Sequence, residues 1–471
     1  MNKFDTHIIC VDDLLLPSSN VEVFAKHLAE LKESGLFAGK SGEVFSIRVL
    51  DDVLKNVIFV GIGSEFEHND LYKIEAAFGR AIGKAYELKS KQVLALLDNR
   101  ISETSTAKAV ETMHLSNYRF NKYKTSKEFP ERPMTIAISS PLEMKSLAEE
   151  AILLASQTCT ARNLVNEPAN VMTPEALAEI TVSEGEKFGF FVEVFEKEDI
   201  ERLGMKAFLS VAKGSACAPK LIVMKYDGGG DETIALIGKG LTYDSGGYCI
   251  KPPDSMVTMK SDMGGAAAVI AAMGAIARNK LKANVVAVVA ACENMISGDA
   301  YHTGDVIGSM SGKYIEIVNT DAEGRLTLAD AITYAKRELH ADKIIDIATL
   351  TGAAITSLGN GITAALSNND ELWNVVENAS KSSTEKVWRL PSDVEIAKQN
   401  KSNIADLKNT GGRAAGTITA GLFLSEFAEN TPWVHLDIAG PSFSDVDLSN
   451  CPAGATGVGV RLLYNTVKNL V

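Results

Sequence analysis

Seven charged residues stand in glycine-rich or apolar stretches of the chain, where fold stability does not require charge. They are Lys239, Asp244, Lys251, Asp262, Asp321, Glu323 and Arg325. Buried carboxylates are costly unless they are paired or bound to a metal, and four of them together would repel one another. Two divalent cations about 3.5–4 Å apart would neutralise them and would create a hydrolytic centre. The set therefore predicts a site for two metal ions.

The spacing of Asp321 and Glu323 indicates that both side chains can reach the same ligand. Asp321 and Glu323 are two apart, so on an extended segment both side chains point to the same side. They lie between a strand-like stretch at 315–318 and a predicted helix, and open α/β sheets bind ligands at such strand ends. Gly324 permits a tight turn. Arg325 then lies at the start of the helix, where an anion is favoured.

The upstream residues repeat this design. Lys239 and Asp244 follow a strand-like stretch, and Asp262 lies just before a helix of small residues. A lysine could bind a metal only with a neutral amine, and burial beside metal charge lowers the pKa of the amine. A second lysine could stay charged and polarise a carbonyl group. Because most of the candidate ligands are oxygen atoms, zinc, manganese and magnesium are all compatible with the set.

The elements that must position these residues alternate between strand and helix, which indicates an α/β fold. Early in the chain we expect strands at 7–11, 44–50, 57–62, 93–97 and 135–139, and helices at 21–34 and 71–90. Later strands are expected at 191–195, 221–226, 233–237, 285–291, 315–318, 344–348 and 434–438. Later helices are expected at 147–163, 176–188, 266–279, 327–339 and 420–428. Strands that are apolar throughout indicate a sheet covered on both faces.

The length of 471 residues predicts two domains. Turn-forming residues at 166–170 end a long amphipathic helix, so the boundary is expected nearby. We expect a smaller N-terminal α/β domain over 1–150. A larger C-terminal catalytic domain over 151–471 would begin with the linker helix and hold a mixed sheet with helices on both faces.

The composition is that of a globular protein, with 46% hydrophobic and 23% charged residues. The net charge of −13 argues against a nucleic-acid-binding surface. Six scattered cysteines without a CxxC pair indicate reduced thiols rather than a disulfide framework. The N-terminus lacks a signal peptide, and the apolar runs are shorter than the roughly 18 residues of a membrane span. We therefore expect a cytoplasmic protein that does not enter the membrane.

Four segments resemble the signatures of a known family, the leucyl aminopeptidases, which are dinuclear metallo-exopeptidases. They are LysGlyLeuThrTyrAspSerGlyGly at 239–247, the Lys251–Pro252 step, MetLysSerAspMetGlyGlyAlaAla at 259–267 and AsnThrAspAlaGluGlyArgLeu at 319–326. The last segment is highly specific, and the intervals between the seven charged residues fit the family pattern throughout. The resemblance covers roughly residues 160–471 well and the N-terminal part only loosely.

This resemblance implies a role for each of the seven residues. The two metals would be held by Lys239, Asp244, Asp262, Asp321 and Glu323. Among these, Asp244 and Glu323 would bridge the two ions, which would be zinc or manganese, with magnesium and cobalt as further candidates. Lys251 would act as an electrophile on the scissile carbonyl, and Arg325 would hold a bicarbonate ion that serves as general base. One metal would bind the free α-amine of a peptide, and a metal-bridging water would attack.

The resemblance also implies a substrate class and an assembly. Met259, Thr349, Leu350 and Gly352 fall where the family forms its pocket for the first side chain. We therefore expect the enzyme to release leucine and other apolar residues from the N-termini of peptides. Family members assemble as homohexamers, with the catalytic domains central and a smaller α/β domain outside.

Each residue alone has a simpler structural explanation. Asp321 and Glu323 could be acids that cap a helix. Lys239 or Lys251 could be a solvated surface lysine, and Arg325 could simply pair with Glu323. The eight-residue match at 319–326 and the upstream set together outweigh these explanations.

Some neighbouring residues are weaker candidates. Tyr248 and Cys249 follow the two glycines where the family more often has an aliphatic residue and a serine, which would alter only the rim of the site. His435, on a predicted buried strand, is interpreted as a core residue rather than a ligand. The glycine-rich stretch 409–416 lacks the ending of a phosphate loop, so we interpret it as a turn beside the active site.

Two other functions compete with a metal-dependent aminopeptidase. The first is a dipeptidase that acts mainly on cysteinylglycine in thiol turnover. The second is a DNA-binding regulator, because some members of the family also bind DNA. The acidic net charge weighs against the DNA-binding alternative.

Overall fold

The computed structural model describes residues 4–14, 24–97, 99–126 and 134–471. Contacts divide the chain into two compact units. The first comprises Met1–Cys159 and Asp445–Ala453, and the second comprises Thr160–Ser444 and Gly454–Val471. The chain therefore passes from one unit to the other three times, and the first passage lies within helix α4, Lys145–Asn166.

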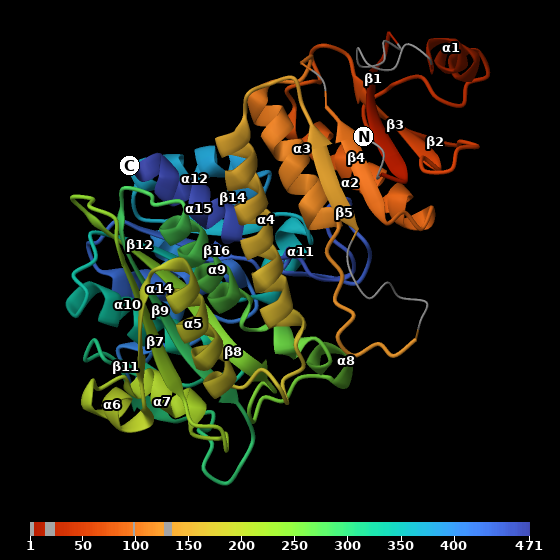
Figure 1. Ribbon diagram of the computed structural model, residues 1–471. Coiled ribbons are helices and arrows are strands. Elements are labelled where there is room, and N and C mark those ends of the chain that lie inside the picture. The colour runs from red at the N-terminus through yellow and green to blue at the C-terminus, as the bar shows by residue number, and fades with distance from the viewer. Residues whose placement is uncertain (1–3, 15–23, 98, 127–133) are drawn as a thin grey trace. The chain divides into compact units, whose positions relative to one another are not determined.

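The first unit contains a five-stranded sheet in the order β2-β3-β1-β4-β5 (Figure 1). The strands are β1 Thr6–Asp12, β2 Val44–Arg48, β3 Asn56–Gly63, β4 Gln92–Leu96 and β5 Thr135–Ser139. Strand β2 is antiparallel to β3, and the other neighbouring pairs are parallel. All five predicted strands of this part are confirmed to within two residues at each end.

Alternate side chains of β1 pack into two separate cores. Ile8 contributes to the core with α2, Leu71–Glu87, and α3, Glu103–Ser116. Ile9 contributes to the core with α1, Ala25–Glu33. The predicted helix 21–34 corresponds to α1, except that residues 21–23 lie outside the described part of the chain.

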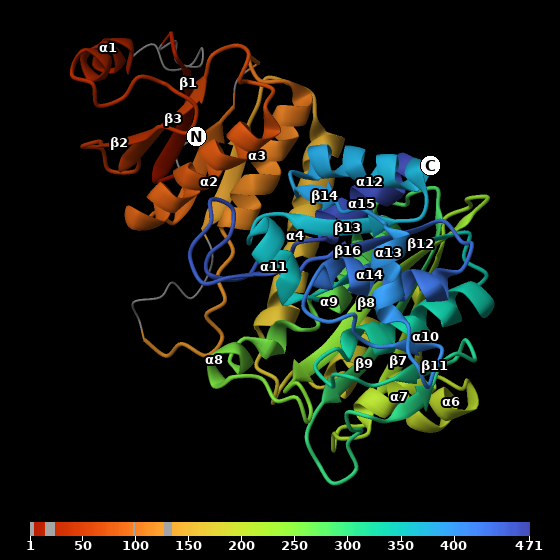
Figure 2. The same cartoon turned by 180° about the vertical axis from the view of Figure 1, so that it is seen from behind.

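The second unit is built on an eight-stranded mixed sheet in the order β14-β13-β16-β12-β8-β9-β7-β6 (Figure 2). Its strands are β6 Phe191–Phe195, β7 Lys220–Asp227, β8 Thr233–Asp244, β9 Asn284–Asn294, β12 Lys343–Ala348, β13 Thr363–Ser367, β14 Val387–Arg389 and β16 Trp433–Asp437. The central strands β9, β8, β12 and β16 are mutually parallel, whereas β6, β7 and β13 form antiparallel pairs. This confirms the predicted mixed sheet.

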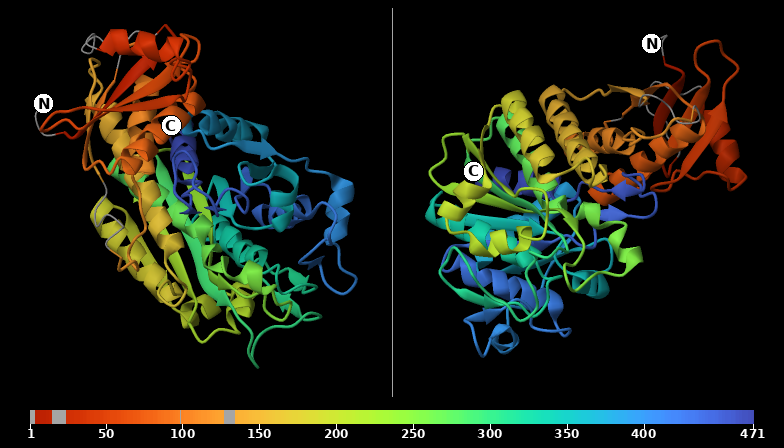
Figure 3. Two further views of the ribbon diagram at one scale, coloured as in Figure 1. Left: turned by 90° about the vertical axis from the view of Figure 1, so that its right-hand side faces the viewer. Right: turned by 90° about the horizontal axis from the view of Figure 1, so that it is seen from below.

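Helices cover both faces of this sheet (Figure 3). Along β8, Ile237 packs into the core that contains α7 Lys206–Ala212, α10 Gly324–Arg337 and α14 Gly416–Ala428. The next residue, Gly238, faces α9, Gly264–Arg278, on the other side. Helices α5, Pro174–Phe188, and α15, Val460–Leu470, pack against α9, and α12, Asp370–Ser383, packs against α15. None of the described helices has the length and apolar character needed to cross a membrane.

Strand β8 extends seven residues beyond the predicted end at Ile237 and includes Lys239 and Asp244. Gly238, just beyond the predicted end, is required by close packing. A Cβ atom there would lie 2.7 Å from Cα of Ala266 in α9, Gly264–Arg278. The strand continues because the helix approaches its backbone.

The predicted strand 315–318 is shorter than expected and belongs to a different sheet. It corresponds to β11, Tyr314–Glu316, in a three-stranded sheet with β10, Val306–Gly308, and β15, Leu407–Lys408. The remaining short elements are α6 Lys197–Arg202, α8 Pro253–Met256, η2 Met259–Ser261, α11 Gly352–Leu358, α13 Val394–Ala397, η3 Lys398–Asn400, β17 Phe443–Ser444 and β18 Gly454–Ala455.

Candidate metal centre

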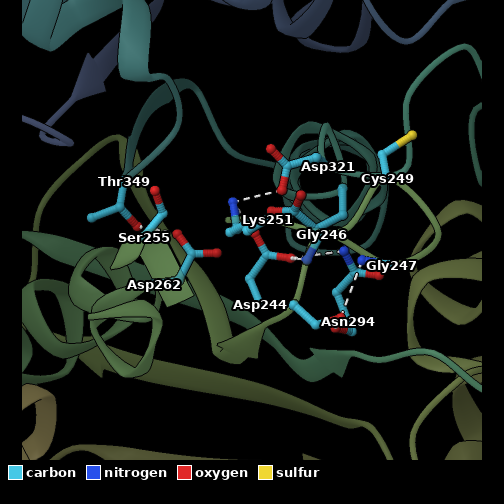
Figure 4. Close-up of polar contacts among 12 residues, drawn as sticks. Asp244, Gly246, Gly247, Cys249, Lys251, Ser255, Asp262, Asn294, Asp321 and Thr349 are labelled. Carbon is cyan, nitrogen blue, oxygen red and sulfur yellow. Dashed lines mark hydrogen bonds and ion pairs between the residues drawn. The ribbon is translucent and has the colours of Figure 1, made fainter. Parts of the chain in front are cut away.

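Three buried carboxylates converge beyond the carboxyl ends of the central strands, and two of them, Asp244 and Asp262, are labelled in Figure 4. Asp244 ends β8, Asp262 follows η2, and Glu323 immediately precedes α10. One oxygen atom of each lies within 4.8 Å of the others. All three side chains are almost completely removed from solvent. The fold thus brings together residues that are far apart in the sequence.

Each of two lysines bridges a pair of carboxylates. The Nζ atom of Lys239 lies 2.8 Å from Oδ2 of Asp262 and 2.9 Å from Oε1 of Glu323. The Nζ atom of Lys251 lies 2.8 Å from Oδ2 of Asp244 and 2.6 Å from Oδ1 of Asp321 (Figure 4). All six residues therefore form one continuous cluster, in which four carboxylates outnumber two ammonium groups.

Burial and the neighbouring carboxylates raise the pKa of two of the acids above its ordinary value. Burial, reinforced by the charge of Asp244, raises the pKa of Glu323 to about 8. Burial also raises the pKa of Asp262 to about 6, although the ammonium of Lys239 opposes the shift. Burial lowers the pKa of Lys239, but the surrounding carboxylates outweigh it and hold that pKa above its ordinary value. A proton on a buried carboxylate thus offsets part of the negative charge that a bound cation could neutralise.

The donor set fits divalent metal ions. Atom Oε2 of Glu323 is buried and receives no hydrogen bond from the described residues. A buried carboxylate oxygen without a donor carries an uncompensated desolvation cost, which a bound cation would remove. Carboxylate oxygens together with a lysine amine are hard or borderline ligands, in keeping with zinc, manganese or magnesium.

A buried guanidinium lies next to the cluster. Arg325, the second residue of α10, is 7% exposed. Its Nε and Nη1 atoms have no hydrogen-bond acceptor among the described residues. Burial lowers the pKa of Arg325 to about 10, so the group stays charged at neutral pH. Unpaired N–H groups of a buried cation at a helix N-terminus provide a binding site for an anion.

Two family models match this chain. The "Cytosol aminopeptidase family, catalytic domain" matches residues 159–464, and the "Cytosol aminopeptidase family, N-terminal domain" matches residues 11–127. The chain belongs to the cytosol aminopeptidase family. It is therefore a hydrolase, a metal-dependent aminopeptidase, which confirms the recognition made from the sequence motifs.

Relatives within the cytosol aminopeptidase family are similar over nearly the whole chain. The "Probable cytosol aminopeptidase" of Clostridium perfringens (strain 13 / Type A) is 54% identical over 448 residues, which cover 92% of this chain and 90% of the relative. That of Treponema denticola is 46% identical over 449 residues, with 93% and 94% covered. The solved structure titled "Bottromycin maturation enzyme BotP in complex with Mn" has a TM-score of 0.88 at 31% identity, with 99% of both chains covered.

The four residues predicted to form a side-chain pocket border the cluster to different degrees. Thr349 contacts it directly: its Oγ1 donates to Oδ1 of Asp262 at 2.8 Å, and its carbonyl accepts from Lys239 at 3.0 Å. Leu350 follows and is partly buried against the main core. Met259 begins η2, and Gly352 begins α11. A Cβ atom on Gly352 would meet no other atom within 4 Å, so there is open space at this position.

The structure also places at the site three polar residues to which the sequence analysis assigned no individual role. Asn294, at the end of β9, donates to Asp244. Thr320 accepts from Cys249 N and donates to the carbonyl of Gly246. Asn409 accepts from the backbone at 318 and 319 and donates to the carbonyl of Asn319. Their positions in the sequence could have indicated them, since each lies at a strand end or next to a candidate metal-binding residue.

Two of the weaker candidates, Tyr248 and His435, differ in their surroundings. Tyr248 stacks on His302 with ring centroids 4.8 Å apart, and its hydroxyl donates to the carbonyl of Ser297. His435 is fully buried, and its Nδ1 lies 2.5 Å from Oδ1 of Asp346, as expected for a core residue. Its Nε2 nevertheless has no partner among the described residues.

Proposed function

We propose that the chain uses two divalent cations to release leucine and other apolar residues from the N-termini of peptides. The observation that carries this proposal is the convergence of Asp244, Asp262 and Glu323 within 4.8 Å, flanked by two lysines. No requirement of the fold explains four carboxylates gathered in a buried place. Bound cations would offset the mutual repulsion of these carboxylates.

The cations would be held by Lys239, Asp244, Asp262, Asp321 and Glu323. When bound, they would polarise the scissile carbonyl and lower the pKa of the attacking water. Zinc or manganese is proposed, with magnesium and cobalt as further candidates. The structural neighbour BotP, which is described in complex with Mn, supports manganese.

Lys251 is the proposed electrophile of this site. Its side chain is 15% exposed, so unlike Lys239 it retains access to an incoming substrate. Once cations neutralise Asp244 and Asp321, the ammonium can instead donate to the carbonyl oxygen of the peptide. It would then stabilise the negative charge that develops on this oxygen during attack.

Arg325 is proposed to hold a bicarbonate ion through its unpaired Nε and Nη1 atoms. A bicarbonate oxygen near the reacting water would accept a proton as general base. Met259, Thr349, Leu350 and Gly352 are proposed to surround the first side chain of the substrate, with the open space beside Gly352 giving it room. Binding of the free α-amine at the metal cluster would restrict cleavage to the N-terminal residue.

The proposed assembly is a homohexamer, and the proposed location is the cytoplasm. Both rest on the resemblance to the leucyl aminopeptidases and on the family name. The domains at 1–150 and 151–471 are proposed as the outer and the catalytic part of each subunit. Light scattering of the purified protein would test the assembly.

The function is tested by metal analysis combined with a substrate panel. The purified protein should contain two divalent ions per chain and should hydrolyse leucine amide, but not N-acetyl-leucine amide, which lacks the free amine. Thorough chelation should abolish the activity, and added manganese or zinc should restore it. Activity that survives chelation would overturn the proposal. A higher kcat/KM for Cys-Gly than for Leu-Gly would favour the dipeptidase alternative.

A further inference from the structure

A single buried amide joins the two segments that carry the candidate ligands. Asn294 is completely buried at the end of β9. Its Nδ2 donates to Oδ1 of Asp244 at 2.8 Å (Figure 4) and also to the carbonyl of Thr320 at 3.0 Å. Thr320 immediately precedes Asp321, so this side chain links the end of β8 to the loop before α10.

These contacts determine which oxygen of Asp244 faces the cluster. Its Oδ1 accepts from Nδ2 of Asn294 and also from the backbone N–H of Gly246 at 2.9 Å. The other oxygen, Oδ2, is left to face Lys251 at 2.8 Å. A carboxylate whose outer oxygen is held by two donors cannot rotate freely, so Oδ2 is kept available for a ligand in the cluster.

The surrounding backbone is shaped to the amide. Gly247 adopts φ +61°, and a Cβ atom there would lie 3.1 Å from Oδ1 of Asn294 and 3.0 Å from Oγ1 of Thr320. The loop after β8 thus passes directly over the Asn294 side chain. An apolar residue of similar size could fill this space, but it could not supply two N–H donors to the two ligand segments.

We propose that Asn294 is a positioning residue of the metal centre: its carboxamide holds Oδ1 of Asp244, so that Oδ2 stays in the geometry that binds divalent cations. The inference rests on the proposed two-metal function and adds to it a residue outside the ligand set. Hydrogen bonds to metal ligands typically contribute 10- to 100-fold to metal affinity.

Tyr301 offers a matched control. It is buried, and its hydroxyl donates to the same Thr320 carbonyl at 2.8 Å. Its one hydroxyl hydrogen is used in that bond, so it cannot also orient Asp244. Tyr301→Phe therefore removes a comparable buried hydrogen bond without releasing the carboxylate.

The test is a calorimetric titration of Mn²⁺ into the metal-free full-length chain. Asn294→Ala and Asn294→Ser should each weaken binding about tenfold or more, whereas Tyr301→Phe should keep the wild-type affinity. Thermal unfolding in chelator should show similar losses for Asn294→Ala and Tyr301→Phe, which would separate positioning from general stability.

The other outcomes are also decisive. Wild-type affinity in both Asn294 variants, or an equal loss in Tyr301→Phe, would overturn the inference. Failure of both Asn294 variants to fold, with Tyr301→Phe folded, would assign Asn294 to the fold and would also overturn it. A wild-type protein that binds no Mn²⁺, Zn²⁺ or other divalent ion would instead refute the proposed two-metal function.

Discussion

Two buried glutamates of the second unit, Glu323 and Glu385, have opposite surroundings. The oxygens of Glu385 accept from the backbone N–H groups of Gly459 and Leu462 at 2.9 and 3.2 Å, and face Nε of Arg461 at 3.1 Å. Glu323 faces Lys239 through one oxygen, and its other oxygen has no donor among the described residues. Burial raises the pKa of both carboxyls above the ordinary value.

Under the proposed function, the contrast separates a charge that the fold uses from one that the fold leaves for a ligand. Glu385 accepts hydrogen bonds from backbone N–H groups at the N-terminus of α15, so its hydrogen-bonding capacity is met within the chain. Glu323 lies among like charges, which costs stability and is a feature that clusters at functional sites. The arginines repeat the contrast, since Arg461 faces Glu385 whereas Nε and Nη1 of Arg325 have no acceptor in the described part of the chain.

The largest expected effect comes from Glu323→Gln. It should lower kcat/KM for leucine amide by at least about 1000-fold, the scale of losing one electrostatic partner of a transition state. Unfolding of the metal-free protein should change by less than about 1 kcal/mol, because removal of one carboxylate also relieves repulsion. Steady-state kinetics and denaturant unfolding in chelator measure the two quantities. A large stability loss with activity retained would contradict the contrast.

Glu385→Gln should show the reverse. Removing one partner of a buried ion pair leaves the other uncompensated, so the free energy of unfolding should fall by about 3 kcal/mol or more. The kcat/KM of the folded fraction should stay near the wild-type value, because Glu385 has no place in the proposed mechanism. Urea unfolding monitored by circular dichroism, beside activity corrected for folded protein, provides the check. Loss of activity at wild-type stability would speak against it.

Arg325→Met extends the contrast to the two buried arginines. Without its bicarbonate the enzyme should lose about 100-fold in kcat, the lower end of a general-base contribution. Added bicarbonate should no longer stimulate the reaction. The melting temperature in chelator should stay the same or rise, because an uncompensated buried charge has been removed. Arg461→Met is the control and should lower the melting temperature. Bicarbonate stimulation of Arg325→Met equal to that of the wild type would refute the anion site.

The smallest expected effect is a pH dependence of metal affinity. Glu323, with its pKa raised to about 8, is mostly protonated in the metal-free protein at pH 6, and a cation must displace that proton. Affinity for Mn²⁺ should therefore fall by about tenfold or more between pH 8 and pH 6. Titration calorimetry in two buffers of different ionisation enthalpy would reveal the released protons. Equal affinity at both pH values would show that the carboxyl is already ionised.

The sequence motifs predicted the family and the convergence of the central ligands, because those residues sit in short specific segments. Asp321 and Glu323 do occupy the connection before α10, but the expected extended segment is wrong, because Asp321 lies in a turn and Glu323 has helical backbone angles. The predicted end of β8 at Ile237 was wrong. Gly238 is explained by the close approach of a helix that begins only at residue 264. A glycine that ends a strand and a glycine that admits a neighbouring backbone look the same in a single sequence.

Other elements escaped prediction for physical reasons of their own. Helix α3 buries Thr106 and Thr112 as well as apolar residues, so it shows no clean apolar stripe. Strand β13 is only five residues long and is rich in alanine, which favours helices. Asn294 was overlooked because a hydrogen bond to Asp244 across 50 residues leaves no trace in local periodicity.

The short excursion of Asp445–Ala453 into the first unit limits how the protein can be dissected. The carbonyl of Ser449 accepts from Ser116 and lies so close to Gly79 that a Cβ atom there would overlap it. Asn450 donates to Glu75 in the same helix as Gly79. A truncated chain starting at Thr160 would carry this peptide without its binding site, and a fragment ending at Cys159 would present the empty site. Genetic separation of the halves therefore calls for a short linker in place of residues 445–453 in one product and for the supplied peptide in the other.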